Sequence, residues 1–160
     1  MFELTAQLKR TMSHKILDAV INSHYSQLII YSRHNYNFKV KSLDDGYNAL
    51  MVALQITDRK KRFRMFEFLI KQDLIDLFDV DKQGRDIYFH AVINECEKEL
   101  DLLLKYFNLE VDCTRADSSG KTILHYAVIN NNLKVLETLL SYCAKYKINV
   151  DIPEKTSKIT

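Results

Sequence analysis

The sequence predicts an all-α fold in which short helix–turn–helix units repeat along the chain and stack into a solenoid. Three observations lead to this prediction. The tetrapeptide Ala-Val-Ile-Asn occurs at residues 19–22, 91–94 and 127–130. Apolar residues inside the copies recur three and four positions apart, which is the spacing of one helix face. The 160 residues include only 3 glycines and 1 proline, too few for an all-β protein full of tight turns.

The positions of the tetrapeptide indicate a repeat of about 36 residues with one copy skipped. Ala53-Leu54-Gln55-Ile56 fills the skipped place. Turn signals at 45–46, 81–84 and 117–120 precede the last three copies, and the glycines at 84 and 120 suit a positive φ. A second apolar block follows each copy. Because two short helices cannot bury their apolar faces alone, the units must stack on one another.

The last copy shows the helical pattern most clearly. Leu124, Ala127 and Val128 define one face of a first helix, and Thr122 is its predicted N-cap. The asparagines at 130–132 predict the break before a second helix. We expect a capping segment, four repeats and the start of a further repeat, over residues 1–12, 13–43, 44–80, 81–116, 117–150 and 151–160.

A chain that stops at the start of a further repeat would be a fragment of a longer array. Its last complete repeat would then expose apolar residues that a following repeat would cover. From this we expect end-to-end self-association through the surface formed by residues 122–145.

The net charge of +2 conceals a strong internal asymmetry. Residues 59–64 carry +5, whereas residues 72–101 carry −6. We expect the basic run to be a loop inserted in the second copy. Such a loop is most often solvated, and the functional alternative is a contact with an acidic partner or a nucleic-acid backbone. Its cations are Arg59, Lys60, Lys61, Arg62 and Arg64.

No pattern typical of catalysis or metal binding stands out. Cys96, Cys113 and Cys143 are widely spaced and form no CxxC pair, so they predict neither a disulfide framework nor a zinc site. Reduced thiols favour a cytoplasmic or nuclear protein. No apolar run approaches the roughly 18 residues of a membrane span. Because no nucleophile–base pair is apparent either, we expect a protein that is not an enzyme and that needs no cofactor.

Residues 117–127 resemble the ankyrin consensus Asp-x-x-Gly-x-Thr-Pro-Leu-His-x-Ala, with Ile123 in place of the proline. Residues 81–91 keep the aspartate, the glycine and the alanine, and the earlier copies keep less. The resemblance extends over residues 13–160. It implies an ankyrin solenoid that recognises other proteins without catalysis, as a scaffold or as an IκB-like regulator of a transcription factor. It also implies that His125 hydrogen-bonds between the turns of adjacent repeats.

The same resemblance places the binding residues on two surfaces, the turn tips and a concave groove. The groove positions follow the small alanine of each first helix, although their isoleucines could instead pack against the neighbouring helix. We expect a partner protein or peptide to contact both surfaces. The predicted tips are Tyr47, Gln83, Arg85, Ser119 and Lys121, and the predicted groove residues are Gln55, Ile56, Ile93, Asn94, Ile129 and Asn130.

Overall fold

The computed structural model describes residues 14–72, 76–106 and 111–148. A helix over residues 14–21 begins this part of the chain. The other helices are α2 (Tyr25–Arg33), α3 (Ala49–Ala53), α4 (Arg59–Ile70), α5 (Ile87–Ile93), α6 (Glu97–Tyr106), α7 (Ile123–Ile129) and α8 (Leu133–Lys145). The described ranges contain two isolated β-bridges, Lys41 with Asn48 and Ala116 with Thr122, and no strand.

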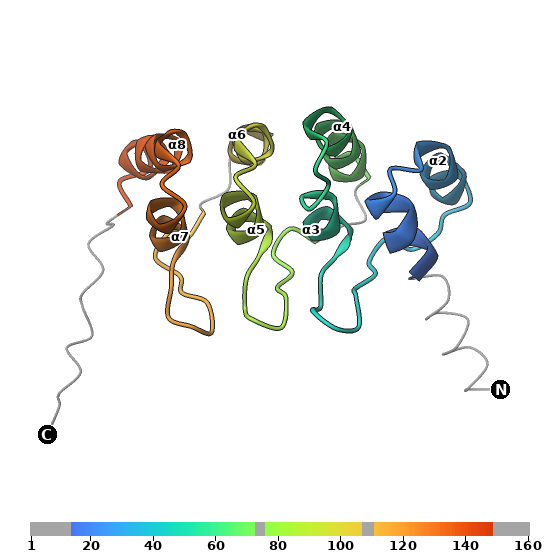
Figure 1. Ribbon diagram of the computed structural model, residues 1–160, viewed down its shortest axis with the longest axis horizontal. Helices are drawn as coiled ribbons and strands as arrows, with labels where there is room; N and C mark the ends of the chain where they lie inside the picture. The colour runs from blue at the N-terminus through green and yellow to red at the C-terminus, as the bar shows by residue number, and fades with distance from the viewer. Residues whose placement is uncertain (1–13, 73–75, 107–110, 149–160) are drawn as a thin grey trace, which may run out of the picture.

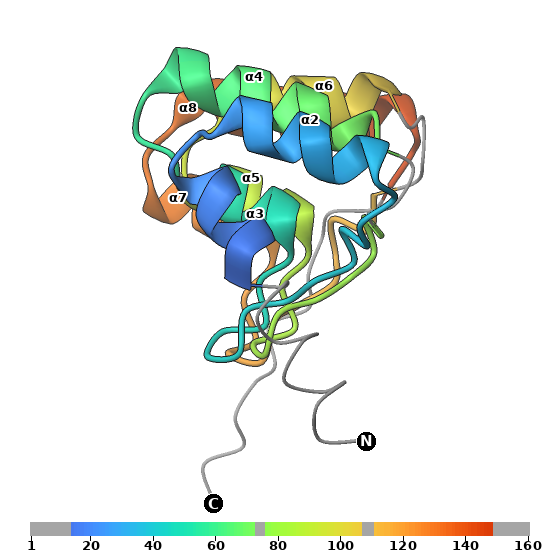
Figure 2. The ribbon, with the colours of Figure 1, turned by 90° about the vertical axis from the view of Figure 1, so that its right-hand side faces the viewer.

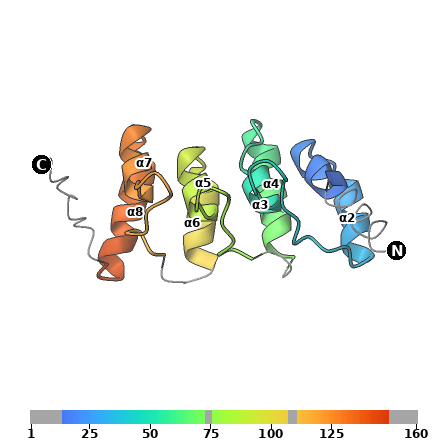
Figure 3. The same cartoon turned by 90° about the horizontal axis from the view of Figure 1, so that it is seen from below.

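The helices form antiparallel pairs that follow one another along a single axis (Figure 1). Figure 2 shows two layers, with α2, α4, α6 and α8 above the first helices and the turn segments projecting below them. Seen from below, the pairs lie side by side in chain order (Figure 3). Contacts join α3 to α5 and α5 to α7 in one layer, and α4 to α6 and α6 to α8 in the other. The predicted all-α solenoid is therefore confirmed.

Side-chain N-caps explain where the first helices start, and residues with positive φ explain where helices end. The side chains of Asn48, Asp86 and Thr122 accept backbone hydrogen bonds at the N-termini of α3, α5 and α7. Each of these caps stands two residues after a glycine, and the φ angles of Gly46, Gly84 and Gly120 are 77°, 75° and 78°. The predicted cap at Thr122 and the predicted positive φ at Gly84 and Gly120 are confirmed. The helix-ending residues with positive φ are Ser23, Asn35, Glu95, Asn131 and Lys147.

The basic run is not an inserted loop, so this prediction was wrong. Residues 59–64 form the first half of α4, and the carboxylate of Asp58 caps them by accepting from the amides of Lys60 and Lys61 at 2.9 and 3.0 Å. The second helices start at Arg59, Glu97 and Leu133, each eleven residues after the N-cap of its first helix. The two residues by which the second copy is longer lie between the start of α4 at Arg59 and Gly84.

A buried arginine explains the error. In the correct register, Arg62 stands where the following copies have Leu100 and Leu136. Its side chain is only 11% exposed, and its Nε donates to Oε1 of Glu99 at 3.0 Å. The Glu99 side chain is 2% exposed, so the pair crosses the interface between α4 and α6 almost without solvent. A charge at a core position concealed the alignment, because the sequence shows the arginine but not its partner.

The core runs along the whole array between the two helix layers. The repeated alanines Ala19, Ala53, Ala91 and Ala127 are at most 1% exposed, which lets neighbouring first helices approach closely. The capping segment over residues 1–12 and the start of a further repeat over residues 151–160 lie outside the described residues. Within the described part, no helix has the length and the hydropathy to cross a lipid bilayer.

Candidate functional site

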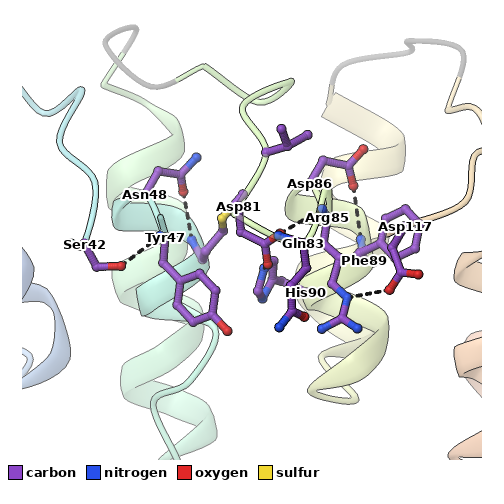
Figure 4. Close-up of polar contacts among 12 residues, drawn as sticks. Ser42, Tyr47, Asn48, Asp81, Gln83, Arg85, Asp86, Phe89, His90 and Asp117 are labelled. Atoms are coloured by element: carbon purple, nitrogen blue, oxygen red, sulfur yellow. Dashed lines mark hydrogen bonds and ion pairs between the residues drawn. The ribbon is translucent and has the colours of Figure 1, made fainter. Parts of the chain in front are cut away.

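Side-chain oxygens fix the shape of each turn segment (Figure 4). Oδ1 of Asp81 accepts from the amides of Gln83 and Arg85 at 2.8 and 2.9 Å. Oδ1 of Asp117 does the same in the next repeat, at 2.9 and 3.1 Å. In the second repeat, the hydroxyl of Ser42 accepts from the amide of Tyr47 at 2.9 Å. The turn residue equivalent to Asp81 is therefore Ser42, and not Asp45 as the sequence suggested.

Single backbone hydrogen bonds join neighbouring turns. The amide of Lys82 donates to the carbonyl of Asp45 at 2.9 Å, and the amide of Ser118 donates to the carbonyl of Gln83 at 2.9 Å. These bonds hold the three turn segments in a row beneath the first helices (Figure 2). The tips and the first helices together form the two sides of the candidate binding surface.

The second oxygen of each turn aspartate holds the first helix of the same repeat. Oδ2 of Asp81 contacts Nε2 of His90 at 3.0 Å, and the hydroxyl of Tyr126 donates to Oδ2 of Asp117 at 2.8 Å. Burial lowers the pKa of His90 despite the hydrogen bond with Asp81, so the imidazole is neutral at pH 7. The ring of Tyr47 packs edge-on against His90, with centroids 4.7 Å apart. The earlier turn is thus linked to α5 as well.

Arg85 clamps the third repeat to the fourth. Its Nε donates to Oδ2 of Asp117 at 2.7 Å, and its Nη2 donates to the hydroxyl of Tyr126 at 2.6 Å. The Arg85 side chain is 20% exposed and the Asp117 side chain is fully buried. A further ion pair, within the third repeat, joins Arg115 to Asp86. Although the sequence predicted Arg85 as a free tip residue, its guanidinium is engaged inside the array.

The predicted groove residues divide into two groups. Gln55, Ile93 and Ile129 follow the repeated alanine by two positions; Gln55 is exposed, Ile93 half-buried and Ile129 61% exposed. Ile56 is buried, with 7% of its surface exposed, so its predicted place on an accessible surface was wrong. It packs in the core instead, where the equivalent position of the next repeat carries Asn94.

The side-chain amides of the two predicted groove asparagines donate hydrogen bonds to backbone carbonyls. Nδ2 of Asn94 donates to the carbonyl of His90 at 2.8 Å, within its own repeat. Nδ2 of Asn130 donates to the carbonyls of Val92 and Ile93, at 3.2 and 3.1 Å, and so joins repeats three and four. The carbonyls of His90 and Val92 also accept the backbone amides of Asn94 and Glu95, so the side-chain amides add a second hydrogen bond at the end of α5. Both side chains are half-buried.

His125 does not bridge adjacent turns as the resemblance implied. Its Nδ1 accepts from the amide of Thr122 at 3.1 Å and lies 2.8 Å from the Thr122 hydroxyl. The two residues form a capping box at the start of α7. The contact is therefore local. The position of His125 in the preceding repeat belongs to Phe89, which is buried.

The remaining tip residues differ in how freely they are presented. Gln83, Ser119 and Lys121 are exposed, and Tyr47 is half-buried. The hydroxyl of Ser119 donates to Oδ1 of Asp117 at 2.7 Å, which places it inside the turn. Nζ of Lys121 lies 5.8 Å from the centroid of the Tyr126 ring. Gln83 and Lys121 therefore present the most accessible polar groups of this set.

A cavity of about 490 Å³ opens between the first two repeats. It is lined by the helix over residues 14–21, by residues 42–47 of the turn and by Val52 and Gln55 from α3 and its C-terminal end. Tyr47 and Gln55 in this lining were predicted from the sequence as binding residues, whereas the helix was not. Ile21, the third residue of the first Ala-Val-Ile-Asn copy, could have indicated it, because Ile93 and Ile129 occupy the same position later.

The basic residues of α4 border a second cavity, of about 690 Å³, together with Glu95, Glu97 and Glu99. Arg59, Lys60, Lys61 and Arg64 are exposed and form no ion pair with the described residues. Four of the five cations of the run are therefore accessible, and the fifth is Arg62 in the buried pair with Glu99.

The described residues contain no cluster of acidic, histidine or cysteine side chains that could hold a metal ion. The three cysteines are free and buried. Burial raises the pKa of Cys96 to about 12, which keeps it as a thiol at neutral pH. None of the three thiols has the exposure that a nucleophile needs.

Asp117→Asn tests the carboxylate that binds Arg85, Tyr126 and the amides of the turn. Burial alone would raise the pKa of Asp117, but hydrogen bonds from Ser119, Arg85 and Tyr126 outweigh it and lower the pKa. We expect the variant to lose about 3 kcal/mol of unfolding free energy at neutral pH, measured in urea melts, because Arg85 keeps a largely buried charge without its partner.

The pH dependence of the same melts provides a second readout. Because the folded-state pKa of Asp117 is depressed, its contribution is complete above the unfolded carboxyl pKa of about 4 and is lost as the pH falls below it. The asparagine variant should lose less stability over that acidic window than the wild type. Asp101→Asn is the control, since its exposed carboxylate only pairs with Lys105 along α6. Equal losses in both variants would contradict the assigned role of Asp117.

The structural features of this array agree with a comparison against protein families. The family model described as ankyrin repeats (3 copies) matches residues 62–152, which is more than half of the chain. A search of curated proteins found no match. Ankyrin repeats are generally protein–protein interaction modules and are typically non-catalytic. The resemblance predicted from residues 117–127 is confirmed, and the chain belongs to the ankyrin repeat family.

Proposed function

We propose that this chain binds a partner protein or peptide through the groove between its turn tips and its first helices. One observation carries the proposal. The position two residues after the repeated alanine is exposed in the first, second and fourth repeats, with Ile21 at 49% and Ile129 at 61%, whereas Ile93 in the third repeat is half-buried. Exposed apolar side chains that recur along one surface are typical of an interaction site.

The rigidity of this surface supports the proposal. The turn tips are held by the carboxylates of Asp81 and Asp117, by backbone bonds between turns and by the Arg85 clamp. A surface whose backbone is fixed before binding loses little conformational entropy when a partner docks. The stacking of repeats extends that surface over several turns.

Both contexts implied by the family, a scaffold and an IκB-like regulator of a transcription factor, would use this groove. They differ in the partner that the groove retains. A scaffold holds components of a larger assembly, whereas a regulator of this kind holds a transcription factor. Identification of the captured protein therefore separates the two.

Gln55→Arg combined with Ile129→Arg places bulky cations on the groove at its second and fourth repeats. We expect partner capture to fall about tenfold or more, because a few central contacts dominate the affinity of an interface. The melting temperature should change little, since both side chains are exposed. The measurement is quantitative mass spectrometry of captured proteins, with a thermal melt of each variant.

The matched control places the same two charges on the second-helix layer, as Gln27→Arg in α2 with Ser141→Arg in α8. Both positions are exposed and lie away from the turn tips. The control should retain the partners of the wild type. A groove variant that captures the same proteins as strongly as the control would contradict the proposed binding surface.

A second candidate function is binding of nucleic acid through the start of α4. The observation that favours it is electrostatic. Arg59, Lys60, Lys61 and Arg64 are exposed at the N-terminal end of the helix, where the helix dipole disfavours positive charge. These four cations have no ion-pair partner among the described residues, and a phosphate backbone is one anionic partner that would compensate them.

The salt dependence of binding to a DNA duplex tests whether α4 binds nucleic acid. Four phosphate contacts predict a log–log slope of about −3.6 against salt, and Lys60→Gln with Lys61→Gln should make it shallower by about 1.8. Lys105→Gln with Lys145→Gln is the charge-matched control, at exposed positions on α6 and α8. A wild-type chain that does not bind the duplex at about 50 mM salt would exclude this function.

We also propose that the last repeat mediates self-association. Val92 is 1% exposed under the fourth repeat, whereas Val128 at the same position of α7 is 63% exposed. Leu104 and Leu140 show the same contrast, at 9% and 42%. The contrast supports an uncovered stacking face on α7 and α8, which a second copy of the chain would cover.

Sedimentation velocity at increasing protein concentration tests the self-association. The wild-type chain should form dimers or larger species, and Val128→Lys with Leu140→Glu should remain monomeric, because the charges face the apolar surface of the second copy. Gln27→Lys with Ser141→Glu also leaves the net charge unchanged and is the control, at exposed positions on α2 and α8. A wild-type chain that stays monomeric at every soluble concentration would refute the proposal.

A further inference from the structure

We propose that the groove between the first two repeats selects a basic amphipathic segment of the partner, in which a lysine or arginine neighbours an aliphatic residue. This inference rests on the proposed function and names the chemistry that the groove would recognise. The cavity of about 490 Å³ between the helix over residues 14–21, the turn 42–47 and α3 is the receiving site.

The floor and one wall of this cavity are apolar. Leu17 and Ile21 come from the first helix of repeat one, Leu43 and Tyr47 from the turn, and Val52 from α3. Ile21 and Leu43 remain 49% and 56% exposed, so they leave apolar surface that a partner can cover. Tyr47 is held in place by its ring contact with His90. An aliphatic side chain placed here removes this surface from water.

Three carboxylates surround the same cavity. Asp18 approaches from the helix, and Asp44 and Asp45 approach from the turn. All three are exposed, and none forms an ion pair with another residue in the described ranges. Lys82, a cation of the following turn, donates to the carbonyl of Leu43 at 2.6 Å. Unpaired carboxylates beside an apolar floor complement a cation carried next to an aliphatic side chain.

The acidic character is confined to this end of the groove. The turns of the third and fourth repeats present Gln83, Ser119 and Lys121 at the corresponding tips. The charge of Asp45 also affects Tyr47 in the groove wall. The pKa of Tyr47 is raised, mainly by burial and then by the negative charges of Asp45 and Asp81. The charge therefore changes sign along the tips, which orients a bound segment with its basic part on the first two repeats.

A phage-displayed library of random peptides, selected on the wild-type chain, is the probe. We expect enrichment of peptides with lysine or arginine beside leucine, isoleucine or valine. Synthetic peptides from the selection should bind Asp44→Asn with Asp45→Asn about fivefold to tenfold more weakly in fluorescence anisotropy, because two exposed charge pairs are lost. Raising the salt concentration should weaken binding to the wild type more than to this variant.

Two comparisons make the result specific. Glu137→Lys changes the net charge by the same amount at an exposed site on α8, and it should leave peptide binding unchanged. The groove variant Gln55→Arg with Ile129→Arg reports on the proposed function separately. Peptides that this groove variant releases but the asparagine variant retains would overturn the inference and leave the proposed function standing. Enrichment of acidic or uncharged peptides, or no enrichment, would also overturn the inference.

Discussion

The array depends on the turn aspartates, because the two oxygens of each carboxylate bind different parts of the chain. One oxygen closes the turn, and the other holds the first helix of the repeat. One oxygen of Asp117 accepts from the amides that close the turn, and the other contacts the hydroxyl of Tyr126 and the guanidinium of Arg85. The carboxylate thereby couples the turn, the first helix and the preceding repeat. Since an isolated helix pair cannot bury its apolar faces, this coupling determines where the next pair stacks.

The same network explains why the binding surface is divided between fixed and accessible side chains. Arg85, Asn94 and Asn130 satisfy buried or helix-terminal groups, so their polar atoms hold the array together. Gln55 and Ile129 have no such task and remain exposed. The positions that stabilise the array therefore alternate, along the same short helices, with the positions that we propose for recognition.

Charge is distributed unevenly over this framework. The buried pair of Arg62 and Glu99 lies between helices and contributes to specific stacking, whereas the four other cations of α4 face solvent. Asp44 and Asp45 give the opposite sign at the first turn. A net charge near zero thus conceals two separate charged surfaces, one on the start of α4 and one in the groove, and each favours a different kind of partner.

The repeat, the helical class, the glycines with positive φ and the cap at Thr122 could all be predicted from the sequence, because these features are set by neighbours a few residues apart. The register of α4, the burial of Ile56, the clamp at Arg85 and the cavity between the first two repeats emerged only when the repeats were packed together. These features depend on side chains more than thirty residues apart, such as Arg62 with Glu99 and Arg85 with Asp117. A periodic pattern identifies the face of a helix, but the partner of each side chain is fixed when the neighbouring repeat packs against it.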